Sequence, residues 1–270
     1  MSSNEKYITE KYFDSKYFTF KTFRHGMDPG SEKLVFALRY QVYCLERGFL
    51  PVDDYPDGLE CDEYDEHSTY VVAINQSNIV VGALRVVAPP EGIPFPFQTH
   101  CTRLFNRPAL PSARDCVEVS RVVVSKVYRR RADDTSYGFS TALLDAPPLS
   151  AIITPSQADS RRKLHPDILL GILRHAYQYC KEVGVGYWYV AIEPSLARML
   201  RRINFAFEAI GEEEDYYGPV TPYILAIDKF ESDVSRNCPA MFNWFQSELA
   251  PEYRVPRINT TSTSCMNAWT

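Results

Sequence analysis

The chain lacks the sequence marks of several classes of protein. Its seven cysteines are scattered, odd in number and free of any C-x-x-C pair, which argues against a disulfide framework or a zinc site and favours a reducing cytoplasm. No uninterrupted run of about 18 apolar residues occurs, so no membrane-spanning helix is expected. The first residues, Met-Ser-Ser-Asn-Glu-Lys, contain no apolar signal core. We expect a cytoplasmic protein without a metal ion and with at most peripheral membrane contact.

An excess of positive charge is also missing. The chain has 29 Lys and Arg against 34 Asp and Glu, a net charge of -5, which argues against binding to nucleic acid. Apolar residues make up 45% and charged residues 23% of the 270 residues, as in ordinary soluble globular proteins. Eighteen Tyr and fifteen Phe supply large apolar faces for a core or a ligand tunnel.

Hydrophobic periodicity predicts one α/β domain over residues 1–245, with an irregular insertion at 126–163 and a flexible tail at 246–270. The expected fold is a mixed central sheet with helices on both faces. The predicted helices cover 31–49, about 101–105, 166–183 and 194–203, the first with an apolar face of Leu34, Phe36, Leu38, Val42 and Leu45. The predicted strands lie within 5–23 and at 69–74, 79–87, 117–124, 187–192, 205–210 and 223–227.

Several short stretches place charged residues within or beside strongly apolar runs. They read Arg39-x3-Tyr43-x5-Phe49, Glu60-Cys-Asp62-Glu-Tyr-Asp65, Gly82-Ala-Leu-Arg85 and Glu118-Val-Ser-Arg121. Charge is costly to desolvate unless it is paired or used. The stretches therefore predict a polar site rather than a purely structural core.

Taken in order, these stretches resemble the GNAT acyltransferase superfamily, and more narrowly the acyl-homoserine-lactone (autoinducer) synthases and the related N-acyl amino acid synthases. The autoinducer-synthase motifs are matched by Arg39, Tyr43 and Phe49, by Asp62 and Asp65 around Tyr64, by the hairpin arginine Arg85, and by Glu118 and Arg121. The chain is also similar to acyltransferases associated with the PEP-CTERM/exosortase protein-sorting system. The resemblance implies a GNAT-like fold and an acyltransferase.

Amide formation from a thioester needs a group that takes a proton from the amine. Glu118 is the predicted general base, acting directly or through a water, and Arg121 is the second predicted catalytic residue. Burial on an apolar strand could raise the pKa of Glu118 towards the working pH. The alternative is a structural ion pair between Glu118 and Arg121. Because residues three apart on a regular strand face opposite sides, either the two have separate roles or a β-bulge re-aims one of them.

A second group of residues is expected to bind the acceptor. Carboxylates suit an ammonium group and arginines suit a carboxylate, which favours a clamp for a zwitterionic molecule. The substrate-binding residues predicted in this way are Arg39, Tyr43, Phe49, Asp62, Asp65, Arg85 and Ser120. The alternative is that the acidic loop is merely solvated, and we prefer that interpretation for Asp53, Asp54 and Asp57. Tyr43 and Phe49 replace the Phe and Trp of the family motif, which leaves the acceptor open.

The donor is predicted from a missing motif. Acetyl-CoA enzymes of the superfamily carry a glycine-containing loop that holds the pyrophosphate at a helix N-terminus, and after Val124 this chain has no glycine pair. Acyl-phosphopantetheine on acyl carrier protein is therefore expected rather than acyl-CoA, with no further cofactor. An acidic carrier would dock on basic residues, and the candidates are Arg129, Arg130, Arg131, Arg161, Arg162 and Lys163, or else Arg198, Arg201 and Arg202.

Together these expectations describe an N-acyltransferase that moves a fatty acyl chain to the amine of an amino acid or a similar molecule. Two alternatives stay open. One is an acyl-homoserine-lactone synthase that uses S-adenosylmethionine. The other is a catalytically silent GNAT-like module that binds acyl carrier protein or lipid.

Overall fold

A computed structural model describes residues 17–105, 110–128 and 165–255. In these residues a single eight-stranded sheet runs through the molecule in the order β1-β2-β3-β4-β5-β8-β6, with β7 paired to β8. The strands are β1 Phe18–Arg24, β2 Ser68–Asn75, β3 Val80–Val87, β4 Cys116–Val124, β5 Tyr187–Ile192, β6 Glu208–Ala209, β7 Glu214–Asp215 and β8 Pro219–Ala226. The predicted mixed sheet is confirmed.

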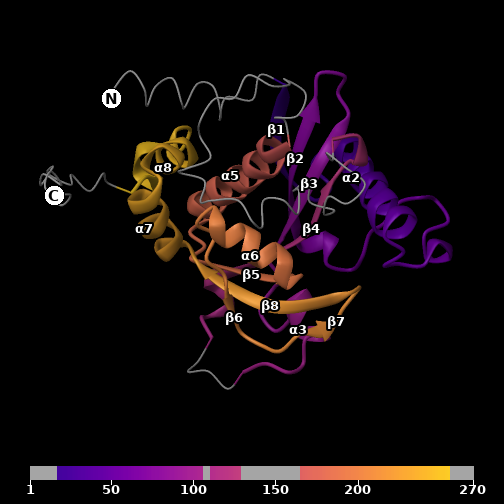
Figure 1. The fold of residues 1–270 in the computed structure, drawn as a ribbon. Coiled ribbons are helices and arrows are strands. Elements are labelled where there is room, and N and C mark those ends of the chain that lie inside the picture. Colours follow the sequence, from indigo (N-terminus) through magenta and orange to yellow (C-terminus); the bar gives the residue numbers. More distant parts are fainter. Residues whose placement is uncertain (1–16, 106–109, 129–164, 256–270) are drawn as a thin grey trace, which may run out of the picture.

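Helices cover both faces of the sheet (Figure 1). They are α2 Pro29–Tyr40, α3 Pro96–His100, α5 His165–Val183, α6 Pro194–Arg202, α7 Ile227–Asn237 and α8 Pro239–Gln246. The main core lies between one sheet face and α5, α6, α7 and α8, and α2 packs on the opposite face over a second apolar cluster. No helix in the described ranges is long and apolar enough to cross a membrane.

Helix α5 approaches the sheet closely because two glycines leave room for it. A Cβ on Gly82 of β3 would lie 2.6 Å from the Ile168 side chain, and one on Gly171 of α5 would lie 2.1 Å from the Phe20 ring. Real Cβ atoms essentially never approach so closely, so a larger residue at either position would force the neighbouring side chain to move. The β1–β3 part of the sheet is thereby fixed against α5.

Strands β4 and β5 are the only parallel neighbours along the sheet that the structure describes, and their pairing is short. It joins Cys116–Glu118 to Tyr187–Tyr189. Beyond this segment β5 still pairs with β8 as far as Ile192, and β4 still pairs with β3 as far as Val124. The two central strands therefore stop pairing with each other at Glu118 and Tyr189.

A β-bulge in β4 changes which residues face each side of the sheet. The register with β3 shifts between Ala83 and Arg85, and Arg121 has a positive φ of 51°. Before the bulge Val119 lies in the core under α5. After it Val123 lies in the cluster under α2. One extra residue therefore reverses the alternation, which is how Glu118 and Arg121 come to share the α2 side.

The first predicted helix is right in place, and its predicted apolar face is right for Leu38 and Val42, which are buried under it, but wrong at both ends. It begins at Pro29 behind an Asp28 cap, ends as an α-helix at Tyr40 and continues as a π-helix over Gln41–Glu46. Leu34 and Leu45 are exposed, whereas Val35 is buried. Each residue of a π-helix turns through a smaller angle than in an α-helix, so α-helical spacing does not predict the side on which Leu45 lies.

Other boundaries also differ from the prediction. The short helix expected at 101–105 lies instead at Pro96–His100, and the strand expected over 205–210 shrinks to Glu208–Ala209. Helices α7 and α8 were not predicted. Leu249 is buried in the main core, so the packed structure continues past residue 245.

Candidate functional site

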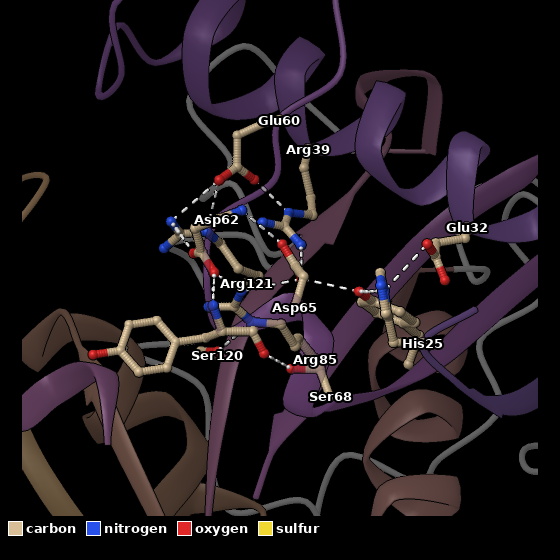
Figure 2. Close-up of polar contacts among 12 residues, drawn as sticks. His25, Glu32, Arg39, Glu60, Asp62, Asp65, Ser68, Arg85, Ser120 and Arg121 are labelled. Atoms are coloured by element: carbon tan, nitrogen blue, oxygen red, sulfur yellow. Dashed lines mark hydrogen bonds and ion pairs between the residues drawn. The ribbon is translucent and has the colours of Figure 1, made fainter. Parts of the chain in front are cut away.

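Six charged side chains meet above β3 and β4 on the α2 side of the sheet (Figure 2). Three are arginines and three are carboxylates: Arg39, Arg85, Arg121, Glu60, Asp62 and Asp65. Arg39 comes from α2, Arg85 from β3 and Arg121 from the β4 bulge. The carboxylates come from the acidic loop between α2 and β2. We call this set the charged network.

Arg39 ties α2 to the acidic loop. Its Nε donates to Glu60, and its Nη1 donates to Asp65 Oδ1 at 2.7 Å. Asp65 also accepts a hydrogen bond from the Tyr70 hydroxyl at 3.0 Å and one from the Asp62 N–H at 2.8 Å. Asp65 is therefore the point at which α2, β2 and the acidic loop are joined.

Arg85 ties β3 to the same loop. Its Nη1 lies 2.5 Å from Asp62 Oδ1 and 3.1 Å from Asp65 Oδ1, and its Nε donates to Ser120 Oγ at 3.1 Å. Ser120 is the register partner of Arg85 on β4. Ser120 thus orients an arginine of the site.

Arg121 is held by two carboxylates and two tyrosine rings. Its Nη2 lies 3.1 Å from Glu60 Oε1 and 3.0 Å from Asp62 Oδ2. The rings of Tyr43 and Tyr217 each lie 5.5 Å from its guanidinium carbon, within the range of cation–π attraction. Arg121 accordingly cross-links the bulge, the acidic loop and the turn before β8.

The charged network is balanced, with three positive and three negative groups, and most of it is buried. Burial alone would raise the pKa of Asp65, but the charges of Arg39 and Arg85 outweigh this and hold the pKa well below its usual range. Burial would also raise the pKa values of Glu60 and Asp62, but nearby arginines lower both. Arg39 and Arg121 lower the pKa of Glu60, and Arg85 and Arg121 lower that of Asp62. All three carboxylates are therefore ionised at neutral pH.

Access to the charged network is limited to one edge. The side chains of Arg39 and Arg85 are 1% exposed, whereas that of Asp62 is 17% exposed and that of Arg121 is 9% exposed. The Nη2 groups of Arg39 and Arg85 are buried without a hydrogen-bond partner among the described residues. A small molecule in contact with the charged network would therefore meet Asp62 first.

Glu118 lies on the same face of the sheet but outside the charged network. It is 1% exposed, and its Oε2 accepts a hydrogen bond from the Phe97 N–H at 2.8 Å. Within the described part of the chain it forms no ion pair, with Arg121 or with any other residue. Burial raises its pKa to about 8, although the Phe97 hydrogen bond and the charges of Arg85 and Arg121 oppose this. Such a carboxyl group can take up and release a proton near neutral pH.

Aromatic rings surround the exposed edge of Arg121. Tyr43 lies 6.4 Å from Phe49, measured between ring centroids, and Tyr217 comes from the turn between β7 and β8. In that turn a Cβ on Gly218 would lie 3.4 Å from the Phe49 ring, so Phe49 packs directly against the turn. The ring of Tyr216 stacks on His100 with a centroid distance of 3.9 Å.

The structure brings the predicted catalytic and substrate-binding residues to one face, from Arg39 to Arg121. The predicted docking residues Arg129, Arg130, Arg131, Arg161, Arg162 and Lys163 lie outside the described residues. Sequence reasoning missed Glu60, which bridges Arg39 and Arg121, although it opens the acidic motif. It also missed Phe97 and the tyrosine pair 216–217, for which the two adjacent tyrosines before a glycine were the only signal.

Comparison with protein families supports the predicted class. Residues 38–136 match the family model described as an acetyltransferase (GNAT) domain. The matched segment includes every residue of the charged network and Glu118.

Solved structures with the same fold include three related proteins. TofI, in a ternary complex with an inhibitor and MTA, aligns with a TM-score of 0.55 and 17% identity over 87% of this chain and 100% of its own. BjaI, a CoA-dependent acyl-homoserine lactone synthase with MTA, aligns with a TM-score of 0.53 and 16% identity over 81% of this chain and 89% of its own. The acyl-homoserine lactone (AHL) synthase LasI aligns with a TM-score of 0.50 and 16% identity over 78% of this chain and 90% of its own. The predicted GNAT-like fold is thereby confirmed.

Proposed function

We propose that this chain, an acyltransferase of the GNAT fold, moves a fatty acyl chain from acyl carrier protein to the amine of an amino acid or a similar small molecule. The observation that carries the proposal is Glu118. It is a buried carboxyl group with a pKa raised to about 8, at the point where β4 and β5 stop pairing. No other carboxyl group of the site titrates in that range, because arginines bind the others.

The proposed reaction needs an uncharged amine that attacks the thioester carbonyl. Glu118, as the carboxylate, removes a proton from the nitrogen as the carbon–nitrogen bond forms. The tetrahedral adduct then collapses to the amide and releases the thiol. Because the surroundings of Glu118 are apolar, the carboxylate is a stronger base there than in water.

In this proposal the charged network positions the acceptor and takes no part in proton transfer. An ammonium or amine group contacts Asp62, the carboxylate with the greatest exposure in the charged network. Arg121 keeps Asp62 oriented through the contact of 3.0 Å. The aromatic rings of Tyr43 and Phe49 cover the same edge and would contact the body of the acceptor.

The donor thioester is assigned to the region between β4 and β5. Among the described residues their facing edges have no ladder partners beyond Glu118 and Tyr189, so the amides of a pantetheine arm could pair there as an added strand would. For the carrier itself, Arg198 and Arg201 are exposed on α6, directly after β5. Exposed arginines of this kind attract an acidic carrier protein.

Glu118→Gln tests the proposal. Thiol release from acyl carrier protein thioesters is followed in the presence of a weakly basic amine that stays uncharged across the pH range. For the wild-type protein, kcat/KM is expected to rise about tenfold per pH unit up to about pH 8 and then to level off, because only the carboxylate form acts. In Glu118→Gln the rate should fall by about 10² to 10⁴ and the pH dependence should vanish.

The matched control is Glu252→Gln, which changes an exposed glutamate outside the site and should keep the wild-type rate. Full activity of Glu118→Gln would show that the base is a different group. Faster transfer from acyl-CoA than from any acyl carrier protein thioester would contradict the proposed donor.

A second candidate function is acyl-homoserine-lactone synthesis from S-adenosylmethionine. The observation that favours it is the group of rings formed by Tyr43, Phe49 and Tyr217 around Arg121, whose ion-pair partner is Asp62. Aromatic faces and a carboxylate both attract a sulfonium cation. The same assay separates the two candidates. Release of methylthioadenosine with S-adenosylmethionine as acceptor would support the synthase, and amide formation with free amino acids alone would support the N-acyltransferase.

A further inference from the structure

An amino acid acceptor carries two charges, and the proposed contact with Asp62 satisfies only its amine. The arginines of the charged network are poorly placed to take its carboxylate. The side chains of Arg39 and Arg85 are 1% exposed, and Arg121 already donates to Glu60 through Nε and to Asp62 through Nη2. A carboxylate at the exposed side of the charged network therefore needs a further donor.

His100 is the last residue of α3, and its ring is held beside the turn between β7 and β8. It stacks on the ring of Tyr216 with a centroid distance of 3.9 Å and an angle of 11° between the planes. On the same helix the Phe97 N–H donates to Glu118 at 2.8 Å, and the Phe97 carbonyl oxygen accepts from the Cys101 N–H at 2.7 Å. The imidazole therefore has a fixed position although His100 is exposed.

Contacts of the second tyrosine in this turn connect His100 to the exposed side of the charged network. The His100 ring lies 5.9 Å from that of Tyr217, measured between centroids. The Tyr217 ring lies 5.5 Å from the guanidinium carbon of Arg121, and Arg121 Nη2 lies 3.0 Å from Asp62 Oδ2. His100 is therefore joined to the ion pair of Arg121 and Asp62 through a single ring, that of Tyr217.

The nitrogens of the His100 ring are available to a ligand. Among the described residues neither nitrogen forms a hydrogen bond or an ion pair. The other histidines whose side chains the structure describes have such partners. His25 and His67 pair with glutamates, and His175 contacts a backbone carbonyl oxygen. A ring that stacking holds in place while its nitrogens are unused is suited to bind a polar group of a substrate.

The charges that act on His100 come from the charged network and the loop that supplies its carboxylates. Burial lowers the pKa of the imidazole below its ordinary value, Arg121 of the β4 bulge adds to this shift, and Glu63 and Asp62 of the acidic loop oppose it. The ring is therefore neutral at neutral pH and offers one N–H donor. A carboxylate that accepts from this N–H favours the protonated ring, because a hydrogen bond between two charged groups is the stronger one.

We propose that His100 determines acceptor specificity by binding the carboxylate of the acceptor, so that the substrate is an amino acid with a free carboxylate rather than a simple amine. This inference rests on the function proposed above. Asp62 then contacts the amine and His100 contacts the carboxylate. An amine without a carboxylate makes only the first of these contacts and binds more weakly.

His100→Phe tests the inference, because it keeps a ring that can stack on Tyr216 and removes both nitrogens. Steady-state rates are measured with two acceptors, the L-amino acid that the wild-type protein acylates fastest and the amide of that amino acid. Loss of a hydrogen bond to a charged group lowers affinity by about ten- to a hundredfold. His100→Phe should raise the KM for the amino acid by that factor, with kcat within about threefold of the wild type, and should leave the KM for the amide within about twofold.

His100→Gln is the complementary variant, because it removes the ring and keeps an N–H donor. It should bind the amino acid more tightly than His100→Phe does. The opposite order, with His100→Phe like the wild type and His100→Gln impaired, would overturn the inference in favour of a stacking role. Equal increases in the KM for the amino acid and for its amide would overturn it as well.

The control is His67→Phe, which changes a histidine that pairs with the exposed Glu66 outside the charged network and should keep the wild-type KM for both acceptors. Circular dichroism and a thermal melt establish that each variant is folded. An increase in the KM for the amino acid as large in His67→Phe as in His100→Phe would show that the effect does not belong to His100, which overturns the inference.

A measurement independent of turnover separates this inference from the proposed function. The pKa of the His100 imidazole is followed by NMR of its ¹³Cε1 in the labelled full-length protein, alone and with an unlabelled mixture of L-amino acids that have uncharged side chains, or with a mixture of their amides. The amino acids should raise the pKa and the amides should not. An equal response to the two mixtures, or no response to either, overturns the inference.

The two proposals fail in different ways. If the amino acids raise the pKa of His100 but the wild-type protein transfers no acyl group to any amine, the proposed function fails while the carboxylate site stands. If the wild-type protein acylates amino acids and their amides with equal KM, the proposed function stands while the role of His100 is overturned.

Discussion

Two buried carboxyl groups of the site have pKa values that move in opposite directions. Asp65 contacts two arginines and the Tyr70 hydroxyl, so its charged form is favoured despite burial. Glu118 has a single backbone donor within the described residues, so burial dominates and its neutral form is favoured. The difference assigns the two residues different tasks. Asp65 is part of the framework, and Glu118 is the group that can exchange a proton.

The framework role of Asp65 leads to a prediction about stability. Asp65→Asn removes the negative charge that Arg39 and Arg85 share while leaving both guanidiniums buried. Loss of one partner from a buried ion pair typically costs about 3 to 5 kcal/mol, and we expect a decrease in the free energy of unfolding of that size. Urea unfolding measures it. Asp53→Asn, at an exposed position of the same loop, should change it by less than about 0.5 kcal/mol, and equal effects of the two variants would refute the assignment.

At the scale of secondary-structure elements, the β4 bulge decides which residues meet. A regular strand would place Glu118 and Arg121 on opposite faces. The spacing of the two residues is compatible with separate roles or with a bulge, and the register shift and the positive φ of Arg121 establish the bulge. It could be anticipated from the spacing of charged residues, but its position could not, because no glycine or other turn signal marks it.

The left-handed backbone at the bulge leads to a second prediction about stability. Arg121→Ala and Arg121→Gly both remove the contacts with Glu60 and Asp62, so both should be less stable than the wild type and nearly inactive. Glycine adopts a positive φ without the steric cost that a Cβ carries, about 1 kcal/mol. In chemical denaturation Arg121→Gly should therefore be more stable than Arg121→Ala by roughly that amount. The opposite order would mean that the bulge relaxes when the arginine is lost.

At the scale of the whole molecule, the two C-terminal helices complete the main core. Phe230 of α7 and Phe245 of α8 lie in the core that α5 and the sheet form, and Arg174 of α5 donates through Nε to the Trp244 carbonyl oxygen at 2.8 Å. Neither helix was predicted, although Ile227, Phe230 and Val234 have helical spacing. The apolar run of β8 continues into Ile227 without a turn signal, so the sequence does not indicate where β8 ends and α7 begins.

A truncation tests where the packed structure ends. A chain that stops at residue 245 loses Leu249, which is buried in the core, and Ser247, which accepts a hydrogen bond from Arg174 at 2.9 Å. Loss of a buried leucine side chain alone costs about 2 to 5 kcal/mol. The truncated chain should therefore melt well below the full-length protein, and Leu249→Ala should reproduce much of the effect. Equal melting temperatures would place the structural boundary at residue 245 after all.

The sequence by itself determined the class of the protein and most of its sheet. Alternating and β-branched runs are local signals, so they predicted β2, β3, β4 and β5 to within about a residue at each end, and the spaced motifs predicted the site residues from Arg39 to Arg121. Only the tertiary structure decided how their charges are used. Whether a carboxyl group is bound by arginines or left in an apolar pocket depends on segments far apart in the chain, which is why the opposite pKa shifts of Asp65 and Glu118 follow only from the placement of the loops.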